Sequence, residues 1–134
     1  ATGYIYILKS LSDNPEIRTL ENLYKIGFTS NTVAERVKKA KSDSTYLMAD
    51  VESIAEFKTF NLNPQKLEDL IHTFFNRVQL DIKIKDCNGD IKSPKEWYVV
   101  PLEKIKQAIE LIISGEIVQY RYDHINQRLV KTDQ

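Results

Sequence analysis

Two tyrosine-bearing segments near the start of the chain carry the residues best suited to chemistry. They are Tyr4-Ile5-Tyr6-Ile7-Leu8 and Tyr24-Lys25-Ile26-Gly27-Phe28-Thr29. A predicted helix with Arg36 follows them, and Glu68 lies on a later predicted helix. Two phenols, one guanidinium and one carboxylate suit hydrolysis of a phosphodiester around a single divalent metal ion. These groups can act together only if the fold brings them to one place.

Arg36 has the side chain that best suits a phosphate. A guanidinium stays charged at physiological pH and can hold two phosphate oxygens at once. This geometry matches the negative charge that develops on the phosphate oxygens in the transition state. The alternative is a surface ion pair with Glu35 or Glu21, which is the commoner role for an isolated arginine.

Glu68 lies at the edge of a predicted apolar helix face, and its carboxylate could bind a magnesium ion. Magnesium sites in proteins commonly use one or two carboxylates together with several waters. The alternative is a solvent-facing helix glutamate. His72 lies four residues further along the same face, and a Glu–His pair could bind a transition metal, although two ligands fall short of a usual site. We expect His72 to contact Glu68 rather than the metal.

The elements that must position these groups follow from alternation, capping residues and turn signals. Aromatic and β-branched residues alternate in three predicted strands, at 3–9, 22–28 and 49–60, and the first two are expected to be antiparallel. Capping residues, together with a proline at the start of the last two, predict three helices: after Asn31 or Thr32 to Lys41, after Asn63-Pro64, and from Pro101 to a stop at Gly115. Residues 10–21 are predicted to form a loop.

Shorter strands are expected at 78–85 and 96–100, on either side of the hairpin dipeptide Asn88-Gly89. Trp97, in the second of them, is expected to anchor the core. Together these elements predict a small α/β (α+β) fold with a central, mainly antiparallel sheet flanked by helices. Residues 1–115 form the predicted domain, and residues 116–134 a C-terminal extension with one strand followed by a disordered end.

Composition limits the functions that the chain can have. At 134 residues, it fits one domain with a core large enough to need no disulfide or structural zinc. Lys plus Arg and Asp plus Glu both number 19, whereas a protein that grips nucleic acid by itself usually carries a basic excess. Residues 1–41 nevertheless hold seven basic and four acidic side chains, a surplus of three (7 − 4).

Other sequence features bear on location and context. The single Cys87 cannot form an internal disulfide, which fits a reducing compartment. No apolar run reaches membrane-spanning length and no signal-peptide pattern is present. We therefore expect a cytoplasmic, intracellular protein without a membrane partner. Because the chain begins with Ala1-Thr2, we also expect either a domain of a longer protein, targeted by its other domains, or a processed product.

The order and spacing of these motifs resemble the GIY-YIG nuclease family over about residues 3–113. Tyr4-Ile5-Tyr6 stands where the first family motif would be, and Tyr24-Lys25-Ile26-Gly27 where the second would be, with a lysine before Ile-Gly. Arg36 lies twelve positions after Tyr24 (36 − 24). These features, with the segments at 67–72 and 96–98, resemble a branch of the family associated with phages and bacteria. No single motif is specific, but their combination is.

The resemblance implies a metal-dependent endonuclease that cleaves DNA, double-stranded or branched, by attack of water. It assigns Tyr6 as the base or water-orienting group, although a free phenol has a pKa of about 10. It assigns Tyr24 to a hydrogen bond with the phosphate or the nucleophile, and Glu68 to a divalent ion, Mg²⁺ or alternatively Mn²⁺. Further contacts with substrate or with the catalytic residues are expected from His72 and from three lysines, Lys25, Lys39 and Lys41.

The chain also departs from the family in two places. Many relatives have a histidine or tyrosine one turn after the arginine, where this chain has Ala40. Lys39 or Lys41 could supply a charge there but not a base at neutral pH. The family often has an asparagine after the metal-binding glutamate, and the nearest one here is Asn76. Both departures bear on the rate rather than on the class of reaction.

Three functions remain open at this stage. The first is the nuclease. The second is a nucleic-acid-binding module of the same fold with little activity, and the third is a protein-interaction module in which both tyrosines only fill the sheet face, as aromatic residues in strands often do. The position of Tyr6, Tyr24, Arg36 and Glu68 relative to one cleft would separate the first function from the others.

Overall fold

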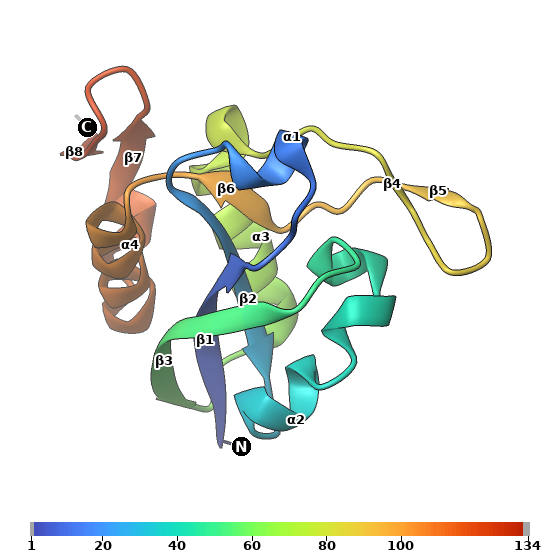
Figure 1. The fold of residues 1–134 in the computed structure, drawn as a ribbon. Coiled ribbons are helices and arrows are strands. Elements are labelled where there is room, and N and C mark those ends of the chain that lie inside the picture. Colours follow the sequence, from blue (N-terminus) through green and yellow to red (C-terminus); the bar gives the residue numbers. More distant parts are fainter. Residues whose placement is uncertain (1, 133–134) are drawn as a thin grey trace.

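The computed structural model describes residues 2–132. Its centre is a four-stranded antiparallel sheet in the order β3-β1-β2-β6 (Figure 1). The strands are β1 (Thr2–Ser10), β2 (Leu23–Thr29), β3 (Val51–Phe60) and β6 (Trp97–Val99). Helices and two small hairpins surround this sheet, which confirms the predicted α+β fold.

Capping residues set the ends of the helices. The helices are α1 (Pro15–Arg18), α2 (Val33–Val37), α3 (Pro64–Phe74) and α4 (Leu102–Ser114). The Asn63 side chain accepts hydrogen bonds from the first free N–H groups of α3, and α4 ends at Gly115, whose φ of 83° suits a residue without a side chain. Four 3₁₀ turns complete the helical part: η1 (Ala40–Ser42), η2 (Ser44–Tyr46), η3 (Asn76–Val78) and η4 (Glu116–Gln119).

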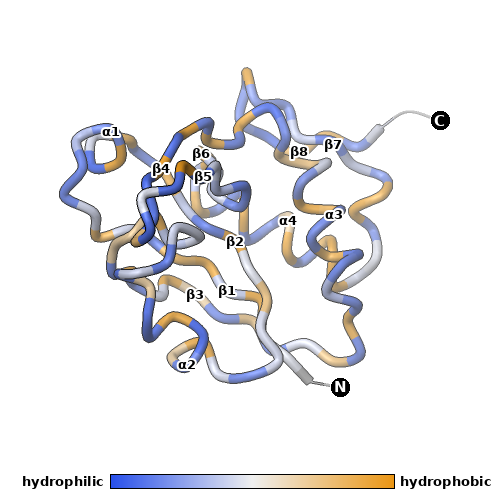
Figure 2. The backbone as a smooth tube through the Cα atoms, turned by 90° about the vertical axis from the view of Figure 1, so that its right-hand side faces the viewer, coloured by the Kyte–Doolittle hydropathy of each residue, from blue (hydrophilic) through white to orange (hydrophobic). Residues whose placement is uncertain are grey.

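The two faces of the sheet have different coverings. One face packs against α3 and α4, and its buried residues are apolar apart from Tyr98. The other face packs against α2, η1 and η2, and its buried cluster contains Tyr6 and Tyr46 beside Leu8, Val33 and Ala40. Figure 2 shows α2 on one side of β1 and β3, with α3 and α4 on the other. A third apolar cluster forms around Trp97, which is fully buried and donates a hydrogen bond to the Thr45 carbonyl at 2.9 Å. Trp97 therefore anchors the core, as predicted.

Several predicted boundaries are wrong. Residues 10–21 contain a short helix, α1, because Asn14 caps it and Pro15 occupies its first position. The helix capped by Thr32 ends at Val37 instead of Lys41, and a separate 3₁₀ turn follows it. The expected strand at 78–85 shrinks to β4 (Ile84–Lys85), which pairs with β5 (Ile91–Lys92). Between them lies a loop, residues 86–90, in which the Asp86 side chain accepts two backbone N–H groups.

The C-terminal extension also differs from the prediction of one strand and a disordered end. After η4, β7 (Tyr120–Asp123) and β8 (Arg128–Lys131) form a hairpin. Tyr122 and Leu129 of this hairpin pack against the α3–α4 core, which explains why a polar segment folds. The expected disordered end falls partly on residues 133–134, which lie outside the described residues. Within residues 2–132, no helix is long and apolar enough to cross a membrane.

Candidate active-site cleft

A small cleft opens where β2 loses its neighbouring strand. Strand β6 pairs only with the first part of β2, from Leu23 to Lys25, and the last contact on that side is the Ile26 N–H, which donates to the Glu96 carbonyl, so β2 has no partner strand there from Gly27 onward. The cleft here has a volume of about 160 Å³. A water molecule in liquid occupies roughly 30 Å³, so the cleft has room for a few waters or one phosphate group.

Elements from both faces of the sheet meet at this edge. Arg36 comes from α2 on one side, and Glu68 comes from α3 on the other. Tyr6 of β1 and Glu96, just before β6, line the interior. Three of the four predicted catalytic residues, Tyr6, Arg36 and Glu68, therefore line one cleft.

Gly27 allows Tyr6 to reach the cleft. Tyr6 and Gly27 are direct partners in the antiparallel pairing of β1 and β2. A Cβ atom built on Gly27 would lie 2.4 Å from both Cζ and the hydroxyl oxygen of Tyr6. The Tyr6 ring therefore occupies the space that any larger side chain at position 27 would fill. This contact is the physical reason for the glycine of the second motif.

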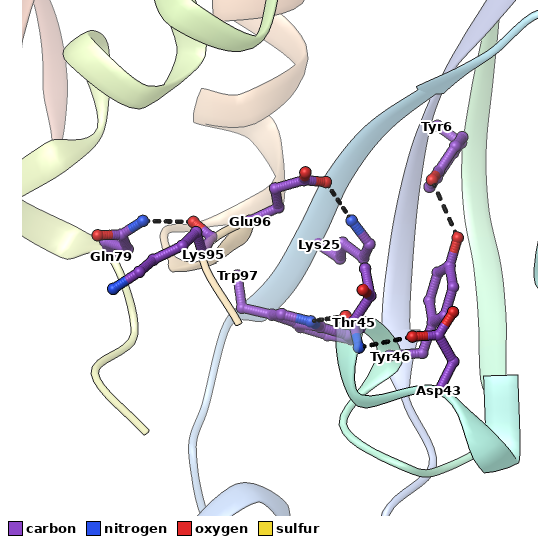
Figure 3. Close-up of polar contacts among 9 residues, drawn as sticks. All are labelled: Tyr6, Lys25, Asp43, Thr45, Tyr46, Gln79, Lys95, Glu96 and Trp97. Carbon is purple, nitrogen blue, oxygen red and sulfur yellow. Dashed lines mark hydrogen bonds and ion pairs between the residues drawn. The ribbon is translucent and has the colours of Figure 1, made fainter. Parts of the chain in front are cut away.

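Tyr46, which had no place in the sequence analysis, joins this arrangement. Its hydroxyl lies 3.3 Å from the Tyr6 hydroxyl, and either group can be the donor (Figure 3). The guanidinium carbon of Arg36 lies 5.3 Å from the centre of the Tyr46 ring, within the range of a cation–π contact. The alternative ion pairs of Arg36 with Glu35 or Glu21 do not form among residues 2–132, and Glu35 pairs instead with Lys38 at 2.7 Å. Arg36 is thus exposed at the cleft, with its charge free for an anion.

Lys25 lies beneath the cleft and is fully buried. Its ammonium group forms an ion pair with Oε2 of Glu96, as Figure 3 shows. It also lies 5.9 Å from the centre of the Tyr6 ring and 5.4 Å from that of Tyr46. Because Glu96 covers it, Lys25 reaches the cleft only through this carboxylate.

The surroundings of these groups perturb their ionisation. Burial raises the pKa of Tyr6, and the hydrogen bond to Tyr46 adds to the rise. Burial also raises the pKa of Tyr46 and of Tyr98, the latter with help from the nearby carboxylates of Glu96 and Glu68. The pKa of Lys25 is lowered by burial, and Glu96 partly opposes this effect. The phenols are therefore held protonated at neutral pH, where they can donate hydrogen bonds but are poor bases.

Tyr24 does not line the cleft, contrary to the prediction that its hydroxyl would. Successive side chains of a strand point to opposite faces, and Lys25 and Gly27 share the face of their partners Leu8 and Tyr6. Tyr24 lies on the other face, where it packs against the apolar core and borders a separate hollow beside α1. On the cleft side of the second motif, the strand instead places Lys25, which lies buried beneath the cleft.

The remaining residues with predicted contacts lie away from the cleft. The exposed His72 ring lies 3.4 Å from Nε2 of Gln79, and this contact replaces the expected one with Glu68. Lys41 pairs with Asp50 at 3.7 Å, and Lys39 borders a hollow beside Cys87. Asn76 lies at the start of η3, bordering a hollow near β7.

Ala40 is buried in the same cluster as Tyr6 and Tyr46. Tyr46, from η2, supplies a second phenol to this cluster beside Tyr6. Sequence reasoning missed this because η2 has no motif. It also gave the segment that begins with Glu96 a structural role, although an acidic residue beside a buried tryptophan was a usable signal.

The metal-binding capacity of the cleft rests on carboxylates. Glu68 is the carboxylate available to a metal ion there, because Glu96, which also lines the cleft, is already paired with Lys25. Both glutamates also border a neighbouring hollow lined by residues 44–45 and 92–95. Among residues 2–132, no group of three or more His, Cys, Asp or Glu side chains could enclose a metal ion. A closed zinc site would need such a group. Oxygen donors with room for water instead fit magnesium, which keeps several waters when bound.

Comparison with known proteins places this arrangement in a family. Residues 3–113 match the model of the T5orf172 domain. The chain is 45% identical over 113 residues to the uncharacterized protein YeeC of Bacillus subtilis strain 168, an alignment that covers 84% of this chain and 30% of YeeC. No solved structure matches the chain. The family match includes both tyrosine-bearing motifs, Arg36, Glu68 and Glu96, and the chain therefore belongs to the T5orf172 domain family.

Proposed function

We propose that this domain is a divalent-metal-dependent endonuclease of the GIY-YIG type that hydrolyses phosphodiester bonds in DNA. The observation that carries the proposal is the convergence of Tyr6, Arg36 and Glu68 on one cleft. These residues come from β1, α2 and α3, and packing alone gives no reason for a phenol, a cation and a carboxylate to meet at a strand edge.

Arg36 is the group that would bind the scissile phosphate. It is exposed at the cleft wall, and its contact with the Tyr46 ring, 5.3 Å from the ring centre, limits where the guanidinium can lie. A preorganised cation stabilises the charge of the transition state without having to reorient during the reaction. Tyr6, held protonated, would donate a hydrogen bond to a phosphate oxygen or to the attacking water.

Glu68 is the residue that would hold the metal ion. A bound divalent cation supplies neutralising charge at the phosphate and lowers the pKa of a coordinated water. The exposed Glu68 carboxylate borders the cleft opposite Arg36, so the two side chains can approach the phosphate from different sides. Glu68 lies at the edge of the buried stripe formed by Leu67 and Ile71, which fixes the helix without using the carboxylate.

The balanced charge of the domain favours a targeted nuclease over one that binds DNA strongly by itself. Lys plus Arg and Asp plus Glu are equal at 19, and non-specific DNA affinity depends on how many phosphates basic side chains neutralise. The chain spans 30% of the length of YeeC, the curated relative that it matches. We infer that further domains bring this module to its DNA.

Cleavage of supercoiled plasmid tests the proposal. The wild-type domain should convert plasmid to nicked or linear product in Mg²⁺ or Mn²⁺, and a chelator should stop the reaction. Glu68→Ala should abolish cleavage and weaken metal binding in a titration, while the fold remains intact.

Asp69→Ala is the matched control, because Asp69 is exposed on the same helix and hydrogen-bonds to Gln65 at 3.0 Å. It should cleave like the wild type. If the wild-type domain binds DNA in a salt-dependent way but does not cleave, the domain is a nucleic-acid-binding module. If it neither binds nor cleaves, a protein-interaction role replaces the nuclease.

A further inference from the structure

The ion pair between Lys25 and Glu96 holds a carboxylate in place at the inner end of the cleft. The Glu96 carbonyl accepts the Ile26 N–H at 3.2 Å, so the backbone of this residue is tied to β2 at the point where the β2–β6 pairing ends. Its side chain is tied to Lys25. Both ends of Glu96 are thus fixed, which is unusual for a surface glutamate with several free rotamers.

The exposure of the two partners is unequal. Lys25 is 0% exposed, whereas the Glu96 side chain is 36% exposed and lines the cleft. Lys25 binds only one carboxylate oxygen, Oε2. The other oxygen has no hydrogen-bond partner among the described residues, and Figure 3 shows it turned away from Lys25. The pair therefore presents one preoriented acceptor to the cleft.

A lysine without contact to solvent or substrate would be costly if it served only to stabilise the fold. Removing an ammonium group from water has a penalty that an ion pair does not always repay. Here it also lies near two tyrosine rings, whose centres are 5.9 and 5.4 Å away. A positioning role accounts for this arrangement, because the buried cation holds the carboxylate in one orientation.

We propose that Glu96 is the general base of the reaction and that Lys25 is the positioning residue that orients it. This inference rests on the proposed nuclease function. As the water oxygen forms its bond to phosphorus, one water O–H bond breaks and its proton passes to the Glu96 carboxylate. The bond from phosphorus to the leaving oxygen breaks, and that oxygen takes a proton from solvent water. Glu96 then returns its proton to solvent.

Tyr6, the other residue that could act as base, is less suited to the task. Its hydroxyl is engaged by Tyr46 at 3.3 Å, and its ring is almost completely buried. Burial raises the pKa of this phenol, so its deprotonated form is scarcer than that of a free tyrosine. A carboxylate is ionised at neutral pH and accepts a proton without first losing one.

Single-turnover cleavage of plasmid by Glu96→Gln tests the proposal most directly. The amide keeps the shape of the side chain and an oxygen for Lys25, but it cannot take up the proton. We expect the rate to fall by about a hundredfold or more, as is typical when a general base is removed, with DNA affinity unchanged. Glu103→Gln, an exposed change in the first turn of α4, should cleave at the wild-type rate.

Two further variants separate catalysis from a structural role. Added formate should restore part of the turnover of Glu96→Ala, because a small carboxylate can fill the space and accept the proton. Formate should not speed the wild type. Lys25→Met should lower kcat by about 10–100-fold, a typical effect of losing a partner that orients an active-site group, while KM is unchanged because Lys25 touches no substrate.

The outcomes distinguish failure of this inference from failure of the function. If the wild type cleaves and Glu96→Gln cleaves at the same rate, the base is another group and the inference is overturned, while the nuclease stands. Folded Glu96→Ala that formate does not rescue would overturn it equally. If Glu96→Ala does not fold, the cleavage rate of Glu96→Gln alone decides whether the inference stands. A wild-type domain without metal-dependent cleavage overturns both.

Discussion

On the face of the sheet that packs against α3 and α4, β1 and β2 contribute Ile5, Ile7 and Ile26 to an apolar core. On the opposite face, the same strands contribute Tyr6, Lys25 and Gly27. The first set is replaceable by other apolar residues of similar volume. The residues of the second set are not replaceable in this way, because each has a specific partner. Tyr6 contacts Tyr46, Lys25 pairs with Glu96, and Gly27 leaves space for the Tyr6 ring. The period of two along a strand thus separates packing from chemistry.

The polar face is fully satisfied despite its burial. Within residues 2–132, no buried side-chain nitrogen or oxygen lacks a hydrogen-bond partner. An unpaired buried polar group costs free energy, so satisfaction is what allows this face to coexist with a stable fold. We therefore expect substitutions on the apolar face to lower stability, and those on the polar face to change activity more than stability.

The largest effect should come from Phe75→Ala on the apolar face. Phe75 is 1% exposed and contacts the rings of Phe74, Tyr98 and Tyr122, with ring centres 5.0–5.9 Å apart. Truncating a buried phenylalanine typically lowers the free energy of unfolding by about 3–5 kcal/mol. Urea unfolding measures the change. A loss below about 1 kcal/mol would mean that this face is not the main core.

Arg36→Ala gives the contrasting case on the polar face. Removing one charge-stabilising donor typically lowers the rate by about 10²–10³-fold, whereas losing a cation–π contact at an exposed site costs only about 0.5–1 kcal/mol of stability. Arg36→Lys should also be slow, because lysine lacks the planar two-point contact. Single-turnover cleavage and salt-dependent DNA binding should be compared. If affinity falls while single-turnover rates stay near normal in both variants, Arg36 only holds the phosphate.

Much of the candidate site could be predicted from sequence. The prediction included Tyr6, Arg36 and Glu68. These three residues could be found because the order of motifs along a chain can be read without knowing how the chain folds. The expectation that the Tyr24 hydroxyl faces the cleft was wrong, because Tyr24 packs on the apolar face, although strand geometry could have corrected it. Counting back two residues from Gly27, which opposes Tyr6, leads to Lys25.

Other parts of the site had no local signal. Tyr46 reaches Tyr6 from a 3₁₀ turn 40 residues away, and such a contact depends on how the segments after α2 fold back on the sheet. Glu96 is placed by the end of the β2–β6 pairing, which is a tertiary feature. The C-terminal hairpin was missed for a similar reason, since its polar sequence gains stability only where Tyr122 and Leu129 reach the core.

Gly27→Ala should lower both stability and cleavage, each to an intermediate extent. The added Cβ would lie 2.4 Å from the Tyr6 phenol, so the ring must move. Overpacking of this kind typically costs about 1–3 kcal/mol, and displacement of Tyr6 should reduce cleavage as well. Thermal unfolding and plasmid cleavage measure the two effects.

Gly89→Ala is the matched control for destabilisation. Gly89 has a φ of 84° and no atom within 4 Å of a built Cβ, so alanine there is strained without touching the cleft. It should cost roughly 1–2 kcal/mol and leave cleavage intact. If both glycine variants lose cleavage in proportion to stability, the loss in Gly27→Ala is a folding effect and Tyr6 has no special role.

The smallest effect concerns Lys25 and the pH dependence of stability. Burial lowers the pKa of Lys25 in the folded state below its usual value of 10.5. Between the folded-state pKa and 10.5, the unfolded chain therefore binds more protons at this site than the folded chain does. The free energy of unfolding must then rise with pH across this interval. Below this pH interval, the folded chain bears the full free-energy penalty of burying a charged lysine. Above pH 10.5 the lysine is neutral in both states, so the penalty is absent.

Lys25→Met removes the titrating group and isolates this contribution. Methionine has a similar length and no charge, and replacing buried charges by apolar groups is often neutral or stabilising. We expect Lys25→Met to be as stable as the wild type or more stable at pH 7, with the wild type gaining on it as the pH approaches 10. Urea unfolding of both proteins at several pH values measures the difference. If the variant is much less stable at pH 7 and the gap shrinks as the pH rises, the Lys25–Glu96 pair stabilises the fold, and the division between a packing face and a chemical face does not hold at this residue.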